Sequence, residues 1–405
     1  MSRIRVLQDK HVTLGVTGSI AAYKAVVLAS ALHQAGALVD VAMTPDAQRF
    51  VQPLSFQAIT HRPVFADLWG PGMETDIAHV TLGQRSQVIV IAPATATMLA
   101  KLAHGLADDP VSITALAARC PIVVAPAMDA GMFSHAATLA NVETLKARGV
   151  VVVEPEAGHL ASGLVGPGRL AAPENIVDVV RATLGARGDL AGRRVLVTAG
   201  GTREAIDPIR YIGNHSSGKM GYAIAEAARD RGADVVLVAA PTAMRAPAGL
   251  RVVHVSSAQD MLSALMERYA SQDVLIMAAA VADFSVGAQA EHKIKRAEQP
   301  LELRLLPNPD LLAATAELWT PRQPVRVGFA AETQDLIEQA VGKLERKRLD
   351  LIIANDVRAD VFGADTDQVT LLWADGRRAE LPRLPKTEVA EHVLDTVAAL
   401  LASRG

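Results

Sequence analysis

The sequence is poor in cysteine, in aromatic side chains and in charge of one sign, and each scarcity excludes a class of protein. A single cysteine, Cys120, excludes an intrachain disulfide and a cysteine-rich metal site, so the cytoplasm is the expected compartment. Aromatic residues make up only 3% of the chain, too few for a platform that stacks nucleic-acid bases. The formal net charge of -3 leaves no basic footprint, so no nucleic-acid partner is expected.

Long hydrophobic runs are also missing. The longest apolar stretch, residues 88–100, is too short to span a bilayer and contains a proline and two threonines, so no membrane association is expected. Residues 1–10 lack the apolar core of a signal peptide. What is present is a chain of 405 residues, 50% hydrophobic and 20% charged, which is typical of a soluble globular protein with two or three domains.

Two parts of the chain share one plan: an apolar run, a turn that contains glycine, a helical stretch and a second apolar run. The first copy occupies residues 12–42 and the second residues 195–238. In the second copy the helix is expected at about residues 218–231, with its apolar positions at helical spacing. This order begins a doubly wound parallel sheet, so we expect two Rossmann-like α/β domains.

Further buried strands are expected at short, largely apolar runs, as in sheets that helices cover on both faces. These runs are residues 88–92, 122–125, 150–153, 274–278, 325–329 and 351–354. The pattern lapses between Arg181 and Arg194, which places the boundary near Leu190 and predicts domains of residues 1–189 and 190–405. Residues 386–402 are expected to form a closing helix.

Three turns at expected strand ends of the N-terminal half carry small residues: residues 17–24, 92–96 and 126–132. Ligands of parallel sheets bind at such ends, where Gly18 would allow close backbone approach and Ser19 could donate to a phosphate. Each turn taken singly is also compatible with ordinary packing. His79 could transfer protons near neutral pH, although a lone histidine is more often structural or exposed.

The C-terminal half carries a denser motif at residues 210–221, Arg-Tyr-Ile-Gly-Asn-His-Ser-Ser-Gly-Lys-Met-Gly, at the start of the expected helix. Bare N–H groups, small hydroxyls and cations at a helix start suit an anionic ligand. Basic residues recur at residues 293–296, and Lys343 and Lys347 lie one helical turn apart. Basic clusters alone are usually solvated surface. The chain lacks a Gly-x-x-x-x-Gly-Lys-Ser/Thr sequence, so no Walker-type site is expected.

Together these motifs resemble, over nearly the whole chain, the bacterial bifunctional phosphopantothenoylcysteine decarboxylase / phosphopantothenate-cysteine ligase family. The resemblance implies two consecutive steps of coenzyme A synthesis. A ligase half would join cysteine to 4'-phosphopantothenate with CTP, through an acyl cytidylate. A flavin half would then decarboxylate 4'-phosphopantothenoylcysteine to 4'-phosphopantetheine. The resemblance also implies a homo-oligomer with trimeric flavin halves and dimeric ligase halves.

For the flavin half, the resemblance implies FMN as the cofactor and His79 as a catalytic residue. Oxidation of the thiol-bearing carbon would supply the electron sink that decarboxylation beside an amide lacks, and the flavin carries out that redox step. The cofactor-binding residues that the resemblance implies are Gly18, Ser19, Ile20, Thr44, Ala92, Pro93, Pro126 and Met128.

Two positions of the flavin half depart from the family pattern. Asp129 replaces an asparagine that holds the substrate carboxylate, and two like charges about 4 Å apart cost about 4 kcal/mol at an effective dielectric near 20. We hypothesise that Asp129 is protonated in the complex or offset by a nearby cation. Ser162 replaces the cysteine that many members use to protonate the ene-thiolate, so we hypothesise that Ser162 binds substrate while water or another group gives the proton. The surrounding residues 158–170 resemble the substrate flap and are also compatible with a plain surface loop.

For the ligase half, the resemblance implies that Arg210 and Asn214 contact the acyl substrate and its activated intermediate. Lys293 would stabilise negative charge that develops at phosphorus. Mg²⁺ would shield the phosphates, with Asp283 as a candidate ligand. The nucleotide-binding residues that the resemblance implies are Met277, Ala279, Ala280, Asp283, Lys293, Pro309, Asp310, Leu311, Leu312, Phe329, Lys343 and Lys347.

Two other interpretations stay open at this point. Asp129 and Ser162 are compatible with a ligase fused to a non-catalytic, flavin-fold binding or regulatory module. A dinucleotide-dependent reductase is a weaker alternative, because neither glycine turn completes a Gly-x-Gly-x-x-Gly sequence.

Overall fold

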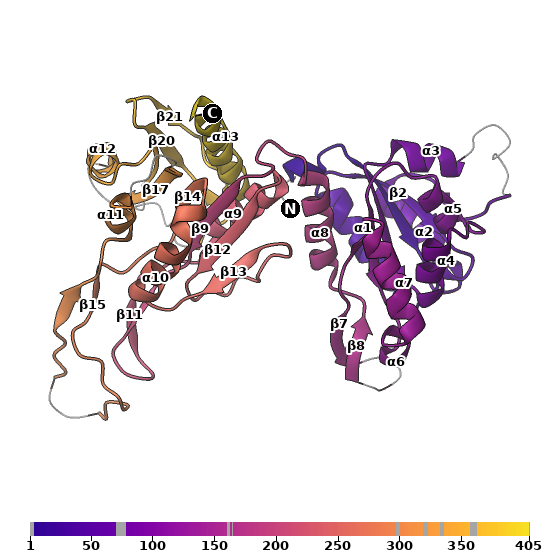
Figure 1. The fold of residues 1–405 in the computed structure, drawn as a ribbon, viewed down its shortest axis with the longest axis horizontal. Coiled ribbons are helices and arrows are strands. Elements are labelled where there is room, and N and C mark those ends of the chain that lie inside the picture. Colours follow the sequence, from indigo (N-terminus) through magenta and orange to yellow (C-terminus); the bar gives the residue numbers. More distant parts are fainter. Residues whose placement is uncertain are drawn as a thin grey trace. The chain divides into compact units, whose positions relative to one another are not determined.

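The chain folds into two compact units, Met1–Gly185 and Ala186–Gly405, each built around a sheet with helices on both faces (Figure 1). The computed structural model describes residues 4–69, 78–159, 163, 165–296, 300–318, 323–332, 336–356 and 363–404. None of the helices in these ranges combines the length and the apolar character that a membrane crossing requires. The expected pair of α/β domains is confirmed.

The first unit contains a six-stranded parallel sheet with the order β3-β2-β1-β4-β5-β6. Its strands are β1 (His11–Val16), β2 (Leu38–Met43), β3 (Val64–Phe65), β4 (Val88–Ala94), β5 (Ile122–Pro126) and β6 (Val151–Val152), and an antiparallel hairpin adds β7 (Glu156–His159) and β8 (Val165–Arg169). Its helices are α1 (Ala22–Gln34), α2 (Pro53–Thr60), α3 (Ala78–Arg85), α4 (Ala96–His104), α5 (Pro110–Leu116), α6 (Ala130–Phe133), α7 (Ala136–Ala147) and α8 (Pro173–Gly185).

Successive side chains of these strands enter two separate cores, which explains why the strands are largely apolar. Val12 and Leu14 pack with α1, α2 and α8 on one face of the sheet. Ile89 and Ile91 pack with α3, α4, α5 and α7 on the other face. Because neither face meets water, no position in these strands needs a polar side chain.

The second unit contains an eight-stranded sheet with the order β13-β12-β9-β14-β17-β18-β20-β21. Its sheet strands are β9 (Arg194–Ala199), β12 (Asp234–Ala239), β13 (Arg251–His254), β14 (Val274–Met277), β17 (Val325–Glu332), β18 (Leu351–Asp356), β20 (Val369–Trp373) and β21 (Arg378–Glu380). Its helices are α9 (Lys219–Asp230), α10 (Ala258–Arg268), α11 (Leu311–Ala316), α12 (Leu336–Arg346) and α13 (Lys386–Arg404). Helices α9 and α13 cover one face, and α10, α11 and α12 cover the other.

This second sheet is mixed rather than wholly parallel. Strands β20 and β21, which the sequence analysis missed, are antiparallel additions next to β18. A tight turn joins them, in which Trp373 N donates to Arg377 O and Gly376 adopts a φ of +87°. So short a connection can only return the chain antiparallel, because a parallel return needs a crossover of a dozen or more residues.

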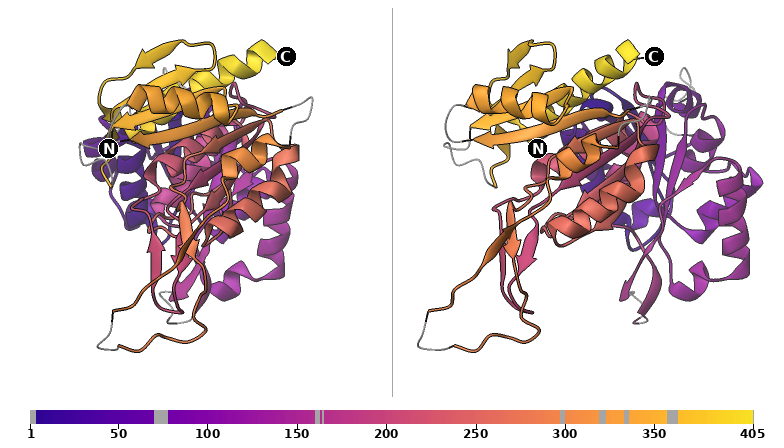
Figure 2. Two further views of the ribbon diagram at one scale, coloured as in Figure 1. Left: turned by 90° about the vertical axis from the view of Figure 1, so that its left-hand side faces the viewer. Right: turned by 60° about the vertical axis from the view of Figure 1, so that its left-hand side comes forward.

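An arm extends from the second unit, away from its sheet (Figure 2). We define the arm as residues 203–213, 284–296 and 300–307. It contains two antiparallel pairs: β10 (Arg203–Ala205) with β11 (Tyr211–Gly213), and β15 (Phe284–Val286) with β16 (Leu305–Pro307). A further short pair, β19 (Thr366–Asp367) with β22 (Leu384–Pro385), precedes α13.

The residues that follow α8 pack on the second unit. Leu190 is fully buried in the core of that unit, and its N–H donates to Arg231 O at 3.0 Å. The Arg231 guanidinium pairs with Asp189 and, at 2.8 Å, with Asp395 of α13. The connecting segment is therefore part of the second folded unit.

Candidate active sites

Both sheets reverse their strand order beside their first strand. In the first unit β1 lies between β2 and β4, and in the second unit β9 lies between β12 and β14. At such a point the loops that leave neighbouring strands turn to opposite faces of the sheet, which opens a crevice at the carboxyl ends of the strands. Nearly all of the expected site residues of each half lie at this edge of their own sheet.

In the first unit, two loops are tied together across the reversal point. The buried Thr17 hydroxyl donates to Pro93 O at 2.7 Å and accepts from Thr95 N at 3.2 Å. The peptide bond between Ala92 and Pro93 is cis. At Gly18 an added Cβ would lie 2.4 Å from Asp46 Cβ, so only glycine lets the two loops approach this closely.

The expected cofactor residues converge at this edge. Gly18, Ser19 and Ile20 follow β1, Thr44 follows β2, Ala92 and Pro93 belong to β4, and Pro126 and Met128 lie at the end of β5. The Ser19 hydroxyl accepts from Ala21 N just ahead of α1, while the Ile20 side chain is 64% exposed. A helix start with a hydroxyl suits an anionic tail, and exposed apolar side chains suit a flat ring, so these residues fit a flavin mononucleotide.

The remaining expected residues of the first unit lie near the same loops. Asp129 caps α6, where its Oδ1 accepts from Gly131 N at 2.9 Å. The neighbouring Met128 N donates to Gly168 O of β8 at 2.9 Å, which ties the Asp129 loop to the β7–β8 hairpin. His79 is the second residue of α3 and is partly buried. The expected flap is thus a two-stranded hairpin at its base, and Ser162 lies outside the described residues.

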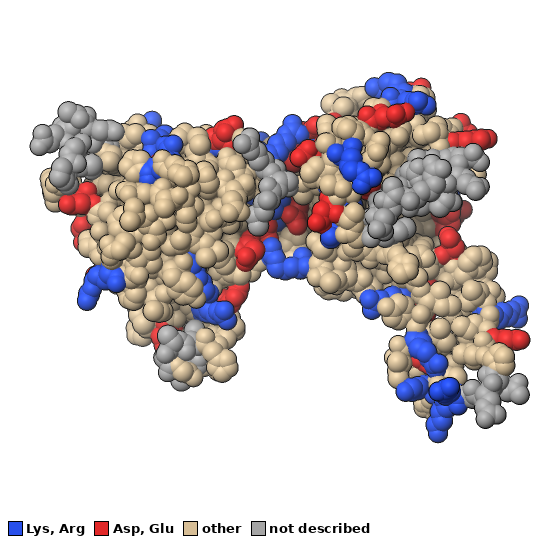
Figure 3. All heavy atoms as spheres, turned by 180° about the vertical axis from the view of Figure 1, so that it is seen from behind, with Lys and Arg blue, Asp and Glu red and all other residues tan. Residues whose placement is uncertain are grey.

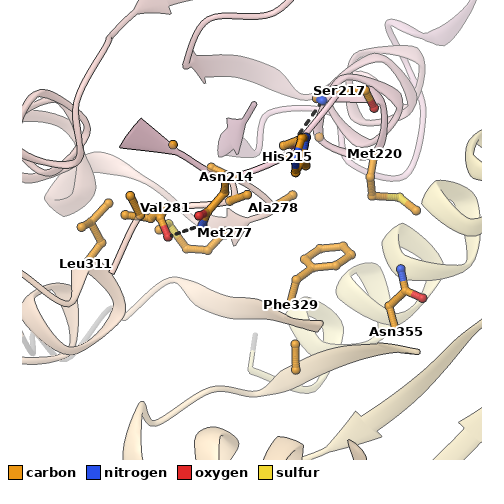
Figure 4. A pocket seen from close by; sticks show the side chains of 18 of the residues that line it. Asn214, His215, Ser217, Met220, Met277, Ala278, Val281, Leu311, Phe329 and Asn355 are labelled. Atoms are coloured by element: carbon orange, nitrogen blue, oxygen red, sulfur yellow. Dashed lines mark hydrogen bonds between the residues drawn. The ribbon is translucent and has the colours of Figure 1, made fainter. Parts of the chain in front are cut away.

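The second unit holds a cavity of about 780 Å³ at its reversal point. Expected residues that line it are Asn214, Met277, Ala279, Ala280, Asp283, Pro309, Asp310, Leu311, Leu312, Phe329 and Lys343. Figure 4 shows Asn214 and Leu311 toward one end and Asn355 toward the other, with the Phe329 ring between them. The motif of residues 213–221 lines the same space, at the start of α9.

Buried threonines tie the loops of this cavity as Thr17 does in the first unit. The Thr198 hydroxyl accepts from Ala279 N at 3.1 Å, and the Thr202 hydroxyl accepts from Ala282 N at 2.9 Å. Asn214 Nδ2 donates to Val281 O at 3.0 Å, so its amide is held in one orientation at the cavity wall. These bonds preorganise the main chain around a ligand.

Two expected lysines are engaged within the protein. Lys343 Nζ donates to Phe329 O at 2.8 Å at the cavity wall. Lys347 pairs with Asp310, and its burial lowers the pKa of its ammonium group. Lys347 does not belong to the cavity lining of the described chain, although its partner Asp310 does.

Arg210 and Lys293 lie on the arm and not among the described residues that line the cavity. The buried carboxylate of Asp207 accepts from the Arg210 guanidinium at 2.9 Å and from Ile294 N at 3.1 Å. These hydrogen bonds, the one from Arg210 above all, hold the pKa of Asp207 well below its usual value. Figure 3 shows cationic side chains gathered at the end of the arm, where Lys293, Lys295 and Arg296 are exposed.

Asp283 is the expected metal ligand, and it lines the cavity. Among the described residues, no three His, Cys, Asp or Glu side chains are arranged to hold a metal ion. A single carboxylate is compatible with Mg²⁺ that is held largely by substrate phosphates and water. The cavity also includes Asp367 and Lys386, which the sequence analysis missed because no recognisable motif surrounds them.

Comparison with known proteins assigns each half of the chain to a family. A model of the family described as "Flavoprotein" matches residues 2–185, and one described as "DNA/pantothenate metabolism flavoprotein C-terminal domain" matches residues 190–401. The fold and its two sites therefore define a two-part flavoprotein of pantothenate metabolism.

Relatives named "Coenzyme A biosynthesis bifunctional protein CoaBC" match over the full length. The Bacillus subtilis (strain 168) protein is 44% identical over 405 residues, which cover 99% of each chain. The Haemophilus influenzae protein is 43% identical over 392 residues, 96% of this chain and 98% of the relative. The Mycobacterium tuberculosis (strain H37Rv) protein is 45% identical over 408 residues, 97% of each chain.

The chain thus belongs to the bifunctional CoaBC family, whose members are phosphopantothenoylcysteine decarboxylases and phosphopantothenate-cysteine ligases of coenzyme A biosynthesis. The full-length match favours this assignment over a ligase fused to a non-catalytic module and over a dinucleotide-dependent reductase.

The close approach at Gly18 yields a test of the flavin crevice. Gly18→Ala would place a methyl group against Asp46 and push the two loops apart, so the purified variant is expected to lose most of its bound flavin. The visible absorbance per mole of protein measures this loss. Gly342→Ala, where an added Cβ meets nothing within 4 Å, is the matched control. Full flavin content in Gly18→Ala would show that this turn does not contact the cofactor.

Proposed function

We propose that the second unit binds CTP in its cavity and couples cysteine to 4'-phosphopantothenate through an acyl cytidylate. The observation that carries the proposal is the cavity of about 780 Å³ bounded by the start of α9, by Phe329 and by Asn214. Free N–H groups at a helix start attract phosphates, and an aromatic face suits a base. The Asn214 amide, fixed by Val281 O, is placed to orient a polar group of the acyl substrate.

In the proposed reaction the carboxylate of 4'-phosphopantothenate attacks the α-phosphorus of CTP. Pyrophosphate leaves, and the carboxylate becomes a mixed anhydride with CMP as its leaving group. The cysteine amine then attacks the acyl carbon, and CMP departs as the amide forms. No protein nucleophile is needed, so positioning and charge stabilisation carry the catalysis. Mg²⁺ held by the phosphates and Asp283 would offset their charge.

The direct test uses the purified full-length protein, 4'-phosphopantothenate, cysteine and each nucleoside triphosphate in turn. The expected result is release of pyrophosphate that requires CTP and 4'-phosphopantothenate. Asn214→Ala is expected to lower this rate by roughly tenfold or more, because one oriented hydrogen bond to a reacting group is worth about 1.5 kcal/mol or more. Equal rates with ATP and CTP would contradict the assignment of the nucleotide.

We also propose that the chain works as a homo-oligomer, with ligase halves paired as dimers. Arg210 and Lys293 lie on the arm and outside the cavity of their own chain, so a second chain is needed if the arm is to meet a cavity. For the flavin halves, Tyr23 and Val27 are 59% and 51% exposed one turn apart on α1, which supports the trimeric contact that the family resemblance implies. A cytoplasmic location stays a prediction from the sequence.

Mixing two inactive variants tests whether the arm acts between chains. Arg210→Gln removes an arm residue, and Asn214→Ala removes a cavity residue. If each site takes its arm from the partner, mixed dimers contain one intact site, so random reassociation restores about a quarter of the wild-type ligase rate. A mixture that stays as inactive as its components would place Arg210 and Asn214 in the site of one chain.

For the first unit we propose that Gly18, Ser19 and the other residues at the ends of β1, β2, β4 and β5 hold FMN. The bound flavin would supply the redox chemistry that lets the substrate lose its carboxylate as carbon dioxide. His79 would transfer a proton to or from the thiol end of the substrate, since an imidazole both accepts and donates protons well near neutral pH. The β7–β8 hairpin, tied to the Asp129 loop, would exclude water from the substrate.

Asp129 is expected to take up a proton when the substrate binds. Its capping bond to Gly131 N favours the ionised form by about 1 kcal/mol, whereas a substrate carboxylate about 4 Å away opposes ionisation by about 4 kcal/mol. The KM of decarboxylation should therefore rise with pH, and Asp129→Asn should remove this rise. Identical pH profiles for the two proteins would show that a neighbouring cation, not protonation, offsets Asp129.

A further inference from the structure

One end of the ligase cavity is lined by three charged residues and one amide. We call Lys219, Asn355, Asp367 and Lys386 the lysine end of the cavity. All four line the cavity. Lys219 is the first residue of α9 and Lys386 the first residue of α13, and these two helices pack side by side on one face of the sheet.

The two lysines differ in what they contact. Lys219 Nζ donates to Gly363 O at 2.7 Å and pairs with Asp365 at 2.6 Å. Lys386 is only 8% exposed, and in the described ranges of the chain its side chain makes neither a hydrogen bond nor an ion pair. Holding an ammonium group at a largely buried position is costly unless an opposite charge lies near it, and at the cavity lining a bound anion can supply that charge.

Asp367 attracts Lys386 but does not neutralise it by contact. Its Oδ2 accepts from Asn355 Nδ2 at 3.0 Å, and its Oδ1 accepts from Gln368 N at 2.9 Å. Burial raises the pKa of Asp367, and burial also lowers the pKa of Lys386. Asn355 Oδ1, buried at the same end, has no hydrogen-bond partner among the described residues.

The helix starts at the lysine end add to its positive potential. Helix α9 spans 12 residues and α13 spans 19, and both begin at this end of the cavity. The N-terminus of a helix carries about half a positive charge. Gly218, with a φ of +76°, leads the chain into α9, where the Ser216 and Ser217 hydroxyls accept from the N–H groups of Gly218 and Lys219. Two helix starts and an unpartnered lysine together make a site for an oxyanion.

We propose that Lys386 binds an oxyanion of a ligase substrate, and that Asp367 positions Asn355 beside it as a hydrogen-bond acceptor. Each ligase substrate can supply such an anion: the nucleotide its polyphosphate, cysteine its carboxylate, and 4'-phosphopantothenate its phosphate or carboxylate. Each also carries a donor for Asn355 Oδ1, an amine in cysteine and a hydroxyl in the other two. This inference rests on the proposed ligase reaction and adds a binding residue to it.

The test compares the kinetics of Lys386 variants in the full-length protein. Lys386→Met keeps the length of the side chain and removes its charge, and Lys386→Arg restores the charge. Lys386→Met is expected to raise the KM of one anionic substrate by about tenfold or more, and Lys386→Arg to recover most of the loss. A rise for CTP, with weaker binding of inorganic pyrophosphate by calorimetry, identifies the polyphosphate. A rise for cysteine alone identifies its carboxylate, and a rise for 4'-phosphopantothenate alone identifies an anion of that substrate.

Two controls separate binding from structural roles. Lys101→Met removes a half-buried lysine of the first unit that pairs with Asp108 and Asp109, and it should leave the ligase KM values unchanged. The double variant Lys386→Met/Asp367→Asn removes both charges. Recovery of wild-type KM values in the double variant would overturn the proposal, because Lys386 would then serve only to balance Asp367. Unchanged KM values for every substrate in Lys386→Met would overturn it as well.

A measurement on the unaltered protein covers the case in which Lys386→Met folds poorly. Acetylation of Lys386 by a small reagent, followed by mass spectrometry, is expected to slow in the presence of CTP, pyrophosphate, 4'-phosphopantothenate or cysteine, whichever supplies the anion. Equal acetylation with and without all four would refute the proposal. An inactive wild-type ligase would instead refute the proposed reaction, so the two failures can be told apart.

Discussion

A buried threonine hydroxyl at the carboxyl end of the first strand ties the binding crevice together in each half of the molecule. Thr17 bonds to the loop after β4, and Thr198 bonds to the loop after β14, in each case across the point where the strand order reverses. Leaving a buried polar group unpaired costs about 1–3 kcal/mol, so each loop is held against its neighbour. In the second unit the Thr202 hydroxyl adds a further bond of this kind, from Ala282 N, so the main chain around each crevice is held at the edge of its sheet.

Most strands of the two large sheets could be predicted from the sequence. Parallel strands that helices cover on both faces are rich in apolar residues, and such runs are easy to recognise. Runs such as residues 88–92 and 351–354 are apolar at every position, and each lies in a strand. Strands β20 and β21 were harder to predict, since β20 mixes buried with partly exposed side chains, β21 has no buried side chain, and their turn carries only one positive-φ glycine. The strands of the arm were not predicted. Short antiparallel pairs outside the sheet bury little apolar surface, so their sequences need no fixed hydrophobic pattern.

The residues of the candidate sites also differ in how well the sequence predicts their positions. Residues directly after a strand, such as Gly18 and Ala279, lie where the sequence placed them, because a strand end fixes position to within a residue or two. Arg210 was expected at the cavity and lies on the arm, because the Asp207 hydrogen bonds that orient it cannot be read from spacing. The sequence analysis missed Lys386 because this residue begins a helix far along the chain from the other site residues. Only the packing of α13 against α9 brings it to the cavity.

The packing of Leu190 and Arg231 bears on how the two halves can be dissected. The segment after Gly185 looks like a spacer in the sequence, yet Leu190 is a core residue of the second unit and Asp189 shares the Arg231 guanidinium with the last helix. A ligase half expressed by itself needs to begin at or before Asp189 if it is to keep this anchor. Only three residues, Ala186, Arg187 and Gly188, separate the end of α8 from it, so truncation by a few residues at this point decides whether the second unit keeps its full core.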